Sequence, residues 1–379
     1  MSFRTRTAAY FNYLMQPGPK SGWDRTALRI LEWLSVLYRI GVNRNCLSYQ
    51  NHPERQVRLG AKVISVGNIT VGGTGKTPAV CMIARRLYAT GVRVAVLNRG
   101  YRSQREQDTS VMSDGSHVFL SAREGGDEAC LMARILLGIP VLVGRDRARS
   151  GRIAIDDFQS QVLILDDGFQ HWQLHRDLDI VLIDGTNPFG SGNVLPRGIL
   201  REPLEHLNRA DLFIITKTDQ TDRITIDHIY EVLRCYNASA PIAEAIHKPA
   251  WCVPFAQWHC MEAADRTPRY FPKGQEAIAV SALGNPDSFE HTIQTFGCQL
   301  VGSIRYDDHY SYTEADVAAM ADKAAAADAI LITTEKDAVK LPAAYIEDCR
   351  LPLYVLGIEM DIVKGNDGIE KILQDILGG

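Results

Sequence analysis

Short apolar runs alternate with longer amphipathic stretches from about residue 61 onward. Several of the runs are nearly continuous in Val, Ile and Leu, which is typical of strands that are covered on both faces. Helical stretches, such as the Ala-rich 315–329, separate the runs. This alternation predicts a mostly parallel sheet with right-handed crossovers. The predicted strands form two sets, first 63–66, 92–97, 141–143, 162–165, 180–183 and 212–216, then 277–281, 301–306, 329–333 and 353–356.

An irregular stretch, 249–272, separates the two sets of predicted strands. It is rich in Trp, Cys and Pro and has no clear hydrophobic period. A chain of 379 residues also favours more than one domain. We therefore predict an N-terminal region 1–50, a larger α/β domain 51–260 and a smaller α/β domain 261–379.

The segment 27–40 has the pattern of an amphipathic helix. Its polar residues fall within about a third of the helix circumference. The segment is shorter and more polar than the ~20 apolar residues that a membrane-spanning helix needs. Two interpretations remain: the helix lies in a membrane interface, where nearby basic residues meet anionic lipid, or it packs on the protein's own core. The residues concerned are Arg29, Glu32, Ser35 and Arg39 on the polar side, with Lys20, Arg25, Arg29, Arg39 and Arg44 as the basic residues.

The composition excludes some classes of protein. A hydrophobic content of 46% and a charged content of 23% are normal for a soluble globular protein. The net charge of −4 argues against a general nucleic-acid binder, so we expect no nucleic-acid partner. The eight cysteines are scattered without a CxxC pair, which predicts free thiols in a reducing compartment.

A glycine-rich loop follows the first predicted strand, in the stretch VGNITVGGTGKTP at 66–78. A strict P-loop has Gly at the position of Thr70. The remaining glycines can still adopt positive φ and turn backbone N–H groups toward phosphate, at the positive end of the following helix. We expect Lys76 to reach the β- and γ-phosphates and Thr77 to bind Mg²⁺ through its hydroxyl. The predicted phosphate-binding residues are Thr70, Val71, Gly72, Gly73, Thr74, Gly75, Lys76 and Thr77.

Two adjacent carboxylates end the predicted strand 162–165, in the stretch VLILDDGFQH. Neighbouring aspartates repel each other unless a cation or a hydrogen-bond donor lies beside them. We predict that Asp166 binds the metal ion and that Asp167 lies close by. The alternative is that one of the two aspartates only caps the turn with Gly168.

Three further clusters carry polar residues in loops. In REGGDEACLMARILL, Asp127 begins a predicted helix, where the helix dipole stabilises a carboxylate; alternatively it is an ordinary N-cap. In RYDDHYSYTEAD, His309 lies between carboxylates and aromatic residues, before a helix that Thr313 is expected to cap. The third cluster is LPRGILREP at 195–203.

Taken together and in order, these stretches resemble the tetraacyldisaccharide 4'-kinase family, the lipid A 4'-kinases of Gram-negative bacteria. The resemblance extends from about residue 20 to beyond residue 350. The family's own loop has Thr where a strict P-loop has Gly, so Thr70 agrees with it. The resemblance rests on VGNITVGGTGKTP, NRGYRS, EGGDEACLMAR, DDGFQHWQLHRDLDIVLID, LPRGILREP, DDHYSYTEAD and TTEKDAVKL.

The resemblance implies a P-loop NTPase-like three-layer α/β/α sandwich with a smaller second α/β domain. It implies an ATP-dependent, Mg²⁺-requiring kinase that works peripherally at the cytoplasmic face of the inner membrane. The acceptor would be the 4'-hydroxyl of an acylated glucosamine disaccharide 1-phosphate, and the product lipid IV-A. A lipid acceptor also favours the membrane-interface interpretation of 27–40.

The resemblance also implies roles for individual residues. Asp127 would be the general base, assisted by His309, while Arg147 and His171 would be cationic groups that meet phosphates. The full catalytic set is Asp127, His309, Lys76, Asp167, Arg147 and His171. The sequence departs from the family at Arg197 and Ile199, where Ala and Pro are common, and at Tyr310, where a second His is frequent.

Other nucleotide-binding proteins share parts of this pattern. The loop also resembles that of partitioning ATPases, which switch states without a phosphorylated product, but Val71 replaces their signature Lys. The stretch IITKTD resembles a guanine-reading motif, but Thr216 stands in place of its Asn. A nucleotide-binding module without turnover is the simplest alternative. We expect a monomer in each case.

Overall fold

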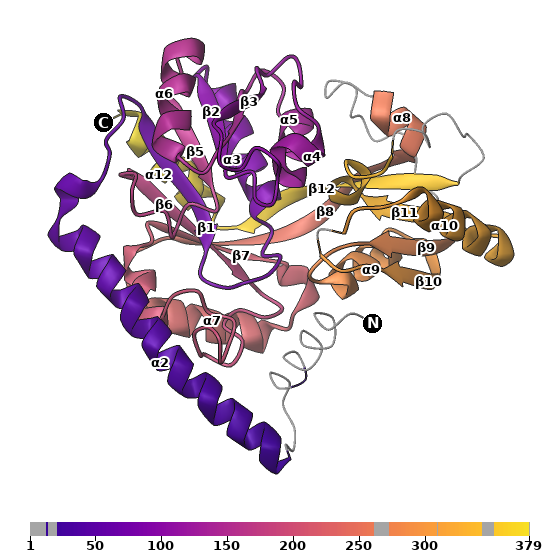
Figure 1. Cartoon of the computed structure of the whole chain (residues 1–379), viewed down its shortest axis with the longest axis horizontal. Helices are drawn as coiled ribbons and strands as arrows, with labels where there is room; N and C mark the ends of the chain where they lie inside the picture. Colours follow the sequence, from indigo (N-terminus) through magenta and orange to yellow (C-terminus); the bar gives the residue numbers. More distant parts are fainter. Residues whose placement is uncertain (1–12, 14–20, 261–272, 309, 343–351, 379) are drawn as a thin grey trace.

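The computed structural model describes residues 13, 21–260, 273–308, 310–342 and 352–378. Its strands form one twelve-stranded sheet with helices on both faces (Figure 1). The strands are β1 (Lys62–Asn68), β2 (Val94–Asn98), β3 (Ser110–Ser113), β4 (Val141–Val143), β5 (Val162–Asp166), β6 (Leu178–Asp184), β7 (Leu212–Thr216), β8 (Ile242–Pro254), β9 (Glu276–Ser281), β10 (Gln299–Arg305), β11 (Ile330–Thr334) and β12 (Leu353–Lys364).

Long helices alternate with these strands, as the apolar pattern predicted. Short 3₁₀ turns occur at η1 (Pro53–Arg55), η2 (Leu204–Arg209) and η3 (Thr218–Gln220). The α-helices are α2 (Gly22–Asn51), α3 (Lys76–Ala89), α4 (Ala122–Gly125), α5 (Asp127–Ile135), α6 (Arg147–Phe158), α7 (Arg223–Tyr236), α8 (Phe255–Cys260), α9 (Pro286–Thr295), α10 (Glu314–Ala327), α11 (Glu335–Ala338) and α12 (Asn366–Gly378).

The sheet order is β10-β9-β11-β12-β8-β7-β6-β1-β5-β2-β4-β3. Neighbouring strands are parallel except at β8–β12 and β3–β4. The predicted mostly parallel α/β sandwich is therefore confirmed, and the two predicted sets of strands are two parts of one sheet. We refer to the part from β3 to β8 as the N-terminal half and the part from β12 to β10 as the C-terminal half.

The long antiparallel pair β8–β12 joins the two halves. The first residues of β8 pair with β7, and the first residues of β12 pair with β11. Sequence reasoning assigned 249–272 to an irregular linker, but β8 continues to Pro254 and α8 follows it. Pro249 lies beside a bulge in the pairing with β12, and proline at a bulge hides the regular alternation of a strand.

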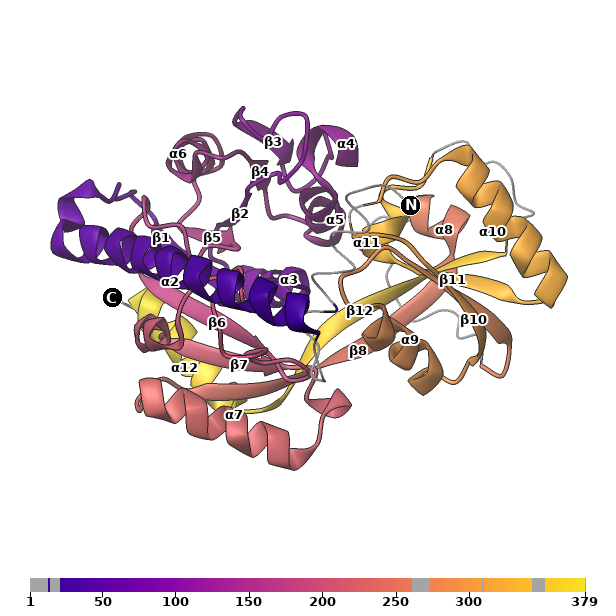
Figure 2. The same cartoon turned by 60° about the horizontal axis from the view of Figure 1, so that its bottom comes forward.

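This connection turns the halves toward each other. Because β8 and β12 are antiparallel, the parallel strands of the two halves run in opposite directions. Because the halves attach to opposite ends of the pair, the carboxyl ends of their strands meet around one space. Figure 2 shows the two groups of strands meeting at β8 and β12. Loops after the strands of both halves therefore line a common site.

Apolar clusters fill both faces of the sheet. In the N-terminal half, α3, α5 and α12 cover one face, while α6 and α7 cover the other. In the C-terminal half, α10 and α9 lie on opposite faces. The last helix thus returns to the N-terminal half, where Ile369, Leu373 and Ile376 join its core. The division at 260/261 stays a prediction.

Helix α2 lies along the outside of the molecule (Figure 2). Polar contacts attach it: the Ser35 hydroxyl donates to the carbonyl of Val194 (2.9 Å), and the Tyr38 hydroxyl donates to the carbonyl of Arg201 (3.0 Å). Its only buried residues are Asp24, Leu31, Ser35 and Cys46, so packing on the protein's own core does not account for its apolar side. Eight large apolar side chains remain exposed: Trp23, Ile30, Trp33, Leu34, Val36, Leu37, Ile40 and Leu47.

No helix in the described part of the chain is both long and apolar enough to cross a bilayer. Six cysteines, at positions 46, 81, 130, 235, 252 and 298, are free thiols, as predicted.

Candidate active site

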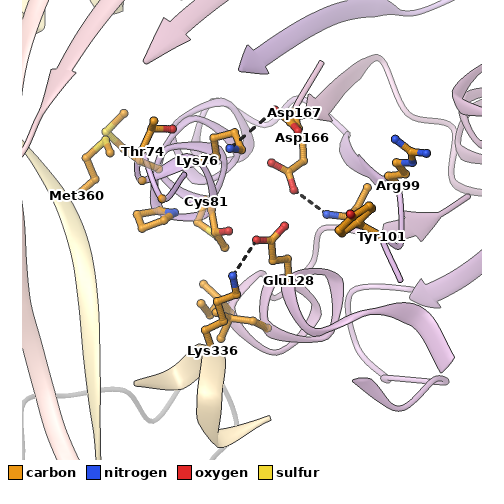
Figure 3. Close-up of a pocket in the computed structure, with 18 of the residues that line it drawn as sticks. Thr74, Lys76, Cys81, Arg99, Tyr101, Glu128, Asp166, Asp167, Lys336 and Met360 are labelled. Carbon is orange, nitrogen blue, oxygen red and sulfur yellow. Dashed lines mark hydrogen bonds and ion pairs between the residues drawn. The ribbon is translucent and has the colours of Figure 1, made fainter. Parts of the chain in front are cut away.

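A cavity of about 1410 Å³ lies where the two halves meet. The N-terminal half contributes the glycine loop, the carboxyl end of β5 and the start of α5. The C-terminal half contributes residues that follow β9, β10 and β11, including Gly284, Asp308 and Lys336. Figure 3 shows Lys76, Asp166, Glu128 and Lys336 converging on the cavity from separate elements. The cavity therefore has room for a nucleotide and an acceptor group together.

The glycine loop connects β1 to α3 as the sequence predicted. Gly72 (φ 120°) and Gly75 (φ 84°) adopt positive φ, whereas Gly73 does not. A side chain at Gly75 would meet the imidazole of His247, because a Cβ there lies 2.6 Å from Nε2. The positions from Gly72 to Thr77 line the cavity, at the start of a helix whose N–H groups and dipole favour anions.

The first two predicted loop residues have a different position. Thr70 is buried and forms a bridge with Leu200, and the Val71 N–H donates to the carbonyl of Ile199 (2.8 Å). Neither residue lines the cavity. Their backbone groups tie the loop to the segment before η2.

A set of polar side chains holds the loop from behind. The Asn68 amide donates to the Thr74 hydroxyl (3.0 Å), and the Thr216 hydroxyl donates to the Thr74 carbonyl (3.0 Å). Lys217 donates to the Gly73 carbonyl (2.9 Å) and forms a buried ion pair with Asp184. The Thr-Lys of IITKTD thus supports the phosphate loop, a role that its resemblance to a guanine motif did not predict.

The backbone turns at Asp167, which has a left-handed φ of 53°. The carboxylates of Asp166 and Asp167 therefore meet different partners. Asp167 accepts from Arg201 at 2.9 and 2.8 Å, and it lies 3.8 Å from the ammonium of Lys76 (Figure 3). Burial alone would raise the pKa of Asp167, but Lys76 and Arg201 outweigh it and lower that pKa. Asp167 is therefore a charged carboxylate, and both of its oxygens accept from Arg201.

Asp166 has the properties of a cation ligand. Its Oδ2 accepts from the Asn98 amide (2.6 Å), while its Oδ1 is buried and has no hydrogen-bond partner. Burial, together with the charges of Glu128 and Asp167, raises the pKa of Asp166 to about 7. A divalent cation beside Oδ1 would satisfy this oxygen and favour its charge. The described residues contain no group of three or more His, Cys, Asp or Glu side chains able to hold a metal ion.

Arg147 and His171 both line the cavity. Arg147 is buried and donates to the carbonyls of Gly144 (2.7 Å) and Asp166 (3.4 Å). Burial lowers the pKa of Arg147 to about 10, so it remains a cation at neutral pH. The expected cationic form of His171 is disfavoured, because burial and the nearby Arg147 lower the pKa of this imidazole to about 4. Of these two residues, Arg147 carries the positive charge at neutral pH.

At the start of α5 the predicted base Asp127 does not line the cavity, whereas the next residue, Glu128, does. Gly126 is the N-cap and Asp127 is the first helical residue, so the N-cap alternative for Asp127 was wrong. Glu128, the next residue, lines the cavity and pairs with Lys336 at 3.2 Å. His309 lies outside the described residues, and its neighbour Asp308 lines the cavity.

Sequence reasoning named the local motifs but missed the residues that connect them. These are Asn68, Asn98, Glu128, Arg201, Thr216, Lys217 and Lys336 as contributors to the site. All seven lie within sequence motifs described above, such as IITKTD and TTEKDAVKL. A polar residue next to a predicted strand end was the available signal, since carboxyl ends of parallel strands share one edge.

Comparisons with known proteins agree on one family. The family model described as "LpxK: Tetraacyldisaccharide-1-P 4'-kinase" matches residues 27–378. A tetraacyldisaccharide 4'-kinase of Halothermothrix orenii is 39% identical over 98% of both chains. That of Syntrophus aciditrophicus is 40% identical over 95% of this chain and 96% of its own. A crystal structure of LpxK from Aquifex aeolicus in complex with ATP is similar with a TM-score of 0.71 and 26% identity, over 92% of this chain and 99% of that one.

Proposed function

The chain belongs to the tetraacyldisaccharide 4'-kinase (LpxK) family, and from this premise we propose which of its residues carry the reaction. The enzyme transfers the γ-phosphate of ATP to the 4'-hydroxyl of tetraacyldisaccharide 1-phosphate, forming lipid IV-A in lipid A biosynthesis. Family membership sets aside the partitioning-type ATPase alternative. The observation that carries the assignment of roles is that the glycine loop, Asp166 and Glu128, the residue after Asp127, line one cavity.

ATP binds with its β- and γ-phosphates on the loop from Gly72 to Thr77. The backbone N–H groups at the start of α3 and the ammonium of Lys76 neutralise the phosphates. Lys217 and Thr216 fix the carbonyls of the loop, so its N–H groups keep their direction. Arg147, a buried cation beside Asp166, supplies a further positive charge on the far side of the phosphates.

The residues present fit a Mg²⁺ ion. The unpartnered Oδ1 of Asp166 and the hydroxyl of Thr77 would hold it, and the remaining ligands would be water and phosphate oxygens, as is usual for this ion. The ion, when bound, neutralises charge on the transferring phosphate. Asp167 is paired with Arg201, which leaves Asp166 as the metal-binding member of the pair.

The acceptor hydroxyl approaches between the glycine loop and the start of α5. Asp127 orients this hydroxyl and accepts its proton, assisted by His309. In a loose phosphoryl-transfer transition state the proton leaves late, so a carboxylate of ordinary basicity suffices. The γ-phosphorus–oxygen bond to the acceptor forms as the bond to ADP breaks. His171 acts as a neutral hydrogen-bonding group in this arrangement.

The helix α2 docks the enzyme on the membrane that holds its substrate. Support comes from the exposed apolar side chains, which include Trp23 (86% exposed), Trp33 (74%) and Leu37 (64%). Aromatic and aliphatic side chains on one side of a helix, with basic residues nearby, suit an interfacial helix. We therefore place the enzyme peripherally at the cytoplasmic face of the inner membrane, as a monomer.

The catalytic roles are tested by labelled phosphate transfer in detergent micelles. Asp127→Ala and Thr77→Ala should each lower kcat by at least ~100-fold. Asp127→Ala should keep its ATP affinity, because Asp127 acts on the acceptor. Arg93→Ala is the control, since its side chain contacts the Gln159 carbonyl away from the cavity. Full activity of Asp127→Ala would contradict the assignment.

Membrane docking is tested by flotation with anionic vesicles. A variant with Trp23, Trp33 and Leu37 changed to Ser should float much less than the wild type, while its activity on micellar substrate remains. As a matched control, Ile224→Ser removes an exposed apolar residue (82%) from α7. Equal flotation of wild type and triple variant would refute docking through α2.

A further inference from the structure

Lys336 belongs to the TTEKDAVKL stretch, whose role the proposed mechanism leaves open. It lies in the first turn of α11, directly after β11. This turn is rigid: Thr334 caps it through the Asp337 N–H (3.1 Å), and Asp337 accepts from the Ala282 N–H (3.1 Å). Asp337 and Lys340 pair with each other at 2.7 Å. Lys336 thus extends from a fixed base into the cavity.

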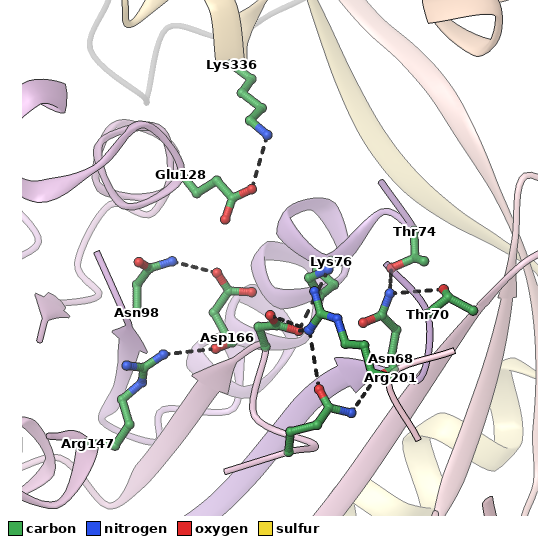
Figure 4. A network of polar contacts seen from close by, with 12 residues as sticks. Asn68, Thr70, Thr74, Lys76, Asn98, Glu128, Arg147, Asp166, Arg201 and Lys336 are labelled. Atoms are coloured by element: carbon green, nitrogen blue, oxygen red, sulfur yellow. Dashed lines mark hydrogen bonds and ion pairs between the residues drawn. The ribbon is translucent and has the colours of Figure 1, made fainter. Parts of the chain in front are cut away.

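The ammonium of Lys336 contacts carboxylates from both halves of the molecule. It lies 3.2 Å from Glu128 on α5 and 3.6 Å from Asp308, the residue before His309. Figure 4 shows Lys336 reaching from the C-terminal half toward Glu128, above the Asp166–Asn98 contact. Among the described residues of the C-terminal half, Lys336 is the only Lys or Arg that lines the cavity.

The surroundings keep this lysine charged. Burial alone would lower the pKa of Lys336, but the carboxylates of Glu128, Asp308 and Asp127 outweigh it and raise that pKa. These carboxylates repel one another, and ATP adds more negative charge. A cation between the carboxylates of Glu128 and Asp308 offsets this repulsion, and Lys336 occupies that place.

We propose that Lys336 is a positioning residue for phosphoryl transfer, which holds the start of α5 and Asp308 in register across the cavity. It acts through Glu128 and Asp308, each adjacent in sequence to a residue of the proposed catalytic pair. The inference rests on the proposed roles of Asp127 and His309. Lys336 itself does not contact the phosphates of ATP in this proposal.

The geometry predicts a specific kinetic signature. A displacement of about 1 Å between catalytic groups can cost on the order of 100-fold in rate. Lys336→Met should therefore lower kcat by about 100-fold and leave the affinity for ATP unchanged, because the glycine loop and Lys76 remain in place. Lys336→Arg should retain most of the activity, since a guanidinium can also bridge two carboxylates.

The test measures kcat, KM for both substrates, ATP affinity and thermal unfolding for the full chain. Lys323→Met is the matched control: it removes a lysine from α10 whose partner is the Ser303 carbonyl (3.3 Å), away from the cavity. It should leave kcat unchanged. A double-mutant cycle of Lys336→Met with Asp308→Asn should be strongly non-additive, because both changes break one contact.

The outcomes separate this inference from the proposed function. If wild type phosphorylates the lipid and Lys336→Met matches it in kcat, Lys336 has no positioning role. Additive losses in the cycle, or a loss of ATP affinity with unchanged kcat, would overturn it as well. If the wild type forms no phosphorylated lipid, the proposed function itself fails.

Discussion

Arg201 controls the availability of Lys76, and its removal has a predictable effect on ATP binding. In the structure, Asp167 accepts from Arg201 at 2.8 and 2.9 Å and lies 3.8 Å from Lys76. Without Arg201, the charge of Asp167 is balanced by Lys76 alone. Lys76 must then leave a stronger ion pair before it can reach the phosphates of ATP.

The size of the effect follows from the lost contact. A hydrogen bond between charged groups contributes roughly 1.5–3 kcal/mol, and partial exposure of this pair places it near 2 kcal/mol. At 1.36 kcal/mol per tenfold change, Arg201→Met should weaken ATP binding by about 30-fold. Isothermal titration calorimetry with ATP measures this directly. Arg197→Met, from the same loop but outside the cavity, is the control and should bind ATP normally.

A second change distinguishes the mechanism from a general disturbance of the loop. In the Arg201→Met background, Asp167→Asn removes the charge that competes for Lys76 and should restore most of the ATP affinity. An Arg201→Met variant that binds ATP as tightly as the wild type would contradict this role of Arg201. A double variant that binds ATP as weakly as Arg201→Met alone would refute it too.

Three further predictions follow from single contacts in the site. The pKa of Asp166 is raised to about 7, so this carboxyl holds its proton more tightly in the folded protein than in the unfolded chain, and the folded state loses stability as pH rises toward 7. Asp166→Asn should therefore raise the unfolding temperature at pH 8 without Mg²⁺. A gain in unfolding temperature of equal size at pH 5 would contradict this prediction. Lys217→Met leaves the buried Asp184 carboxylate without its ion-pair partner. The free energy of unfolding, measured with urea, should fall by about 3–5 kcal/mol. A loss below about 1 kcal/mol would contradict the buried ion pair. Gly75→Ala places a Cβ at positive φ and 2.6 Å from His247 Nε2, so it should abolish measurable ATP binding in calorimetry; normal binding would show that the loop is more adaptable than its backbone indicates.

Local motifs were predictable because their chemistry lies within a few consecutive residues. The glycine loop, the aspartate pair at the end of β5 and the Thr313 cap of α10 all appear where the sequence places them. The parallel strands were also predictable, because strands buried on both faces read as continuous apolar runs.

Contacts between distant segments could not be predicted in the same way. The pairing of Lys336 with Glu128 depends on how β8 and β12 set the two halves against each other, and Pro249 concealed part of β8. The neutral state of His171 depends on burial that no local pattern reveals. The exposed apolar side of α2 likewise required the structure, since an amphipathic pattern fits a core or a membrane equally well.

The proposed kinase reaction is tested most directly by an assay that compares ADP release with lipid phosphorylation, using ATP labelled in the γ-phosphate and tetraacyldisaccharide 1-phosphate in micelles. One labelled phosphate should appear on the 4' position of the lipid for each ADP formed, and no ADP should form without the lipid. ADP released without labelled lipid would contradict this reaction and would instead indicate a nucleotide-hydrolysing switch.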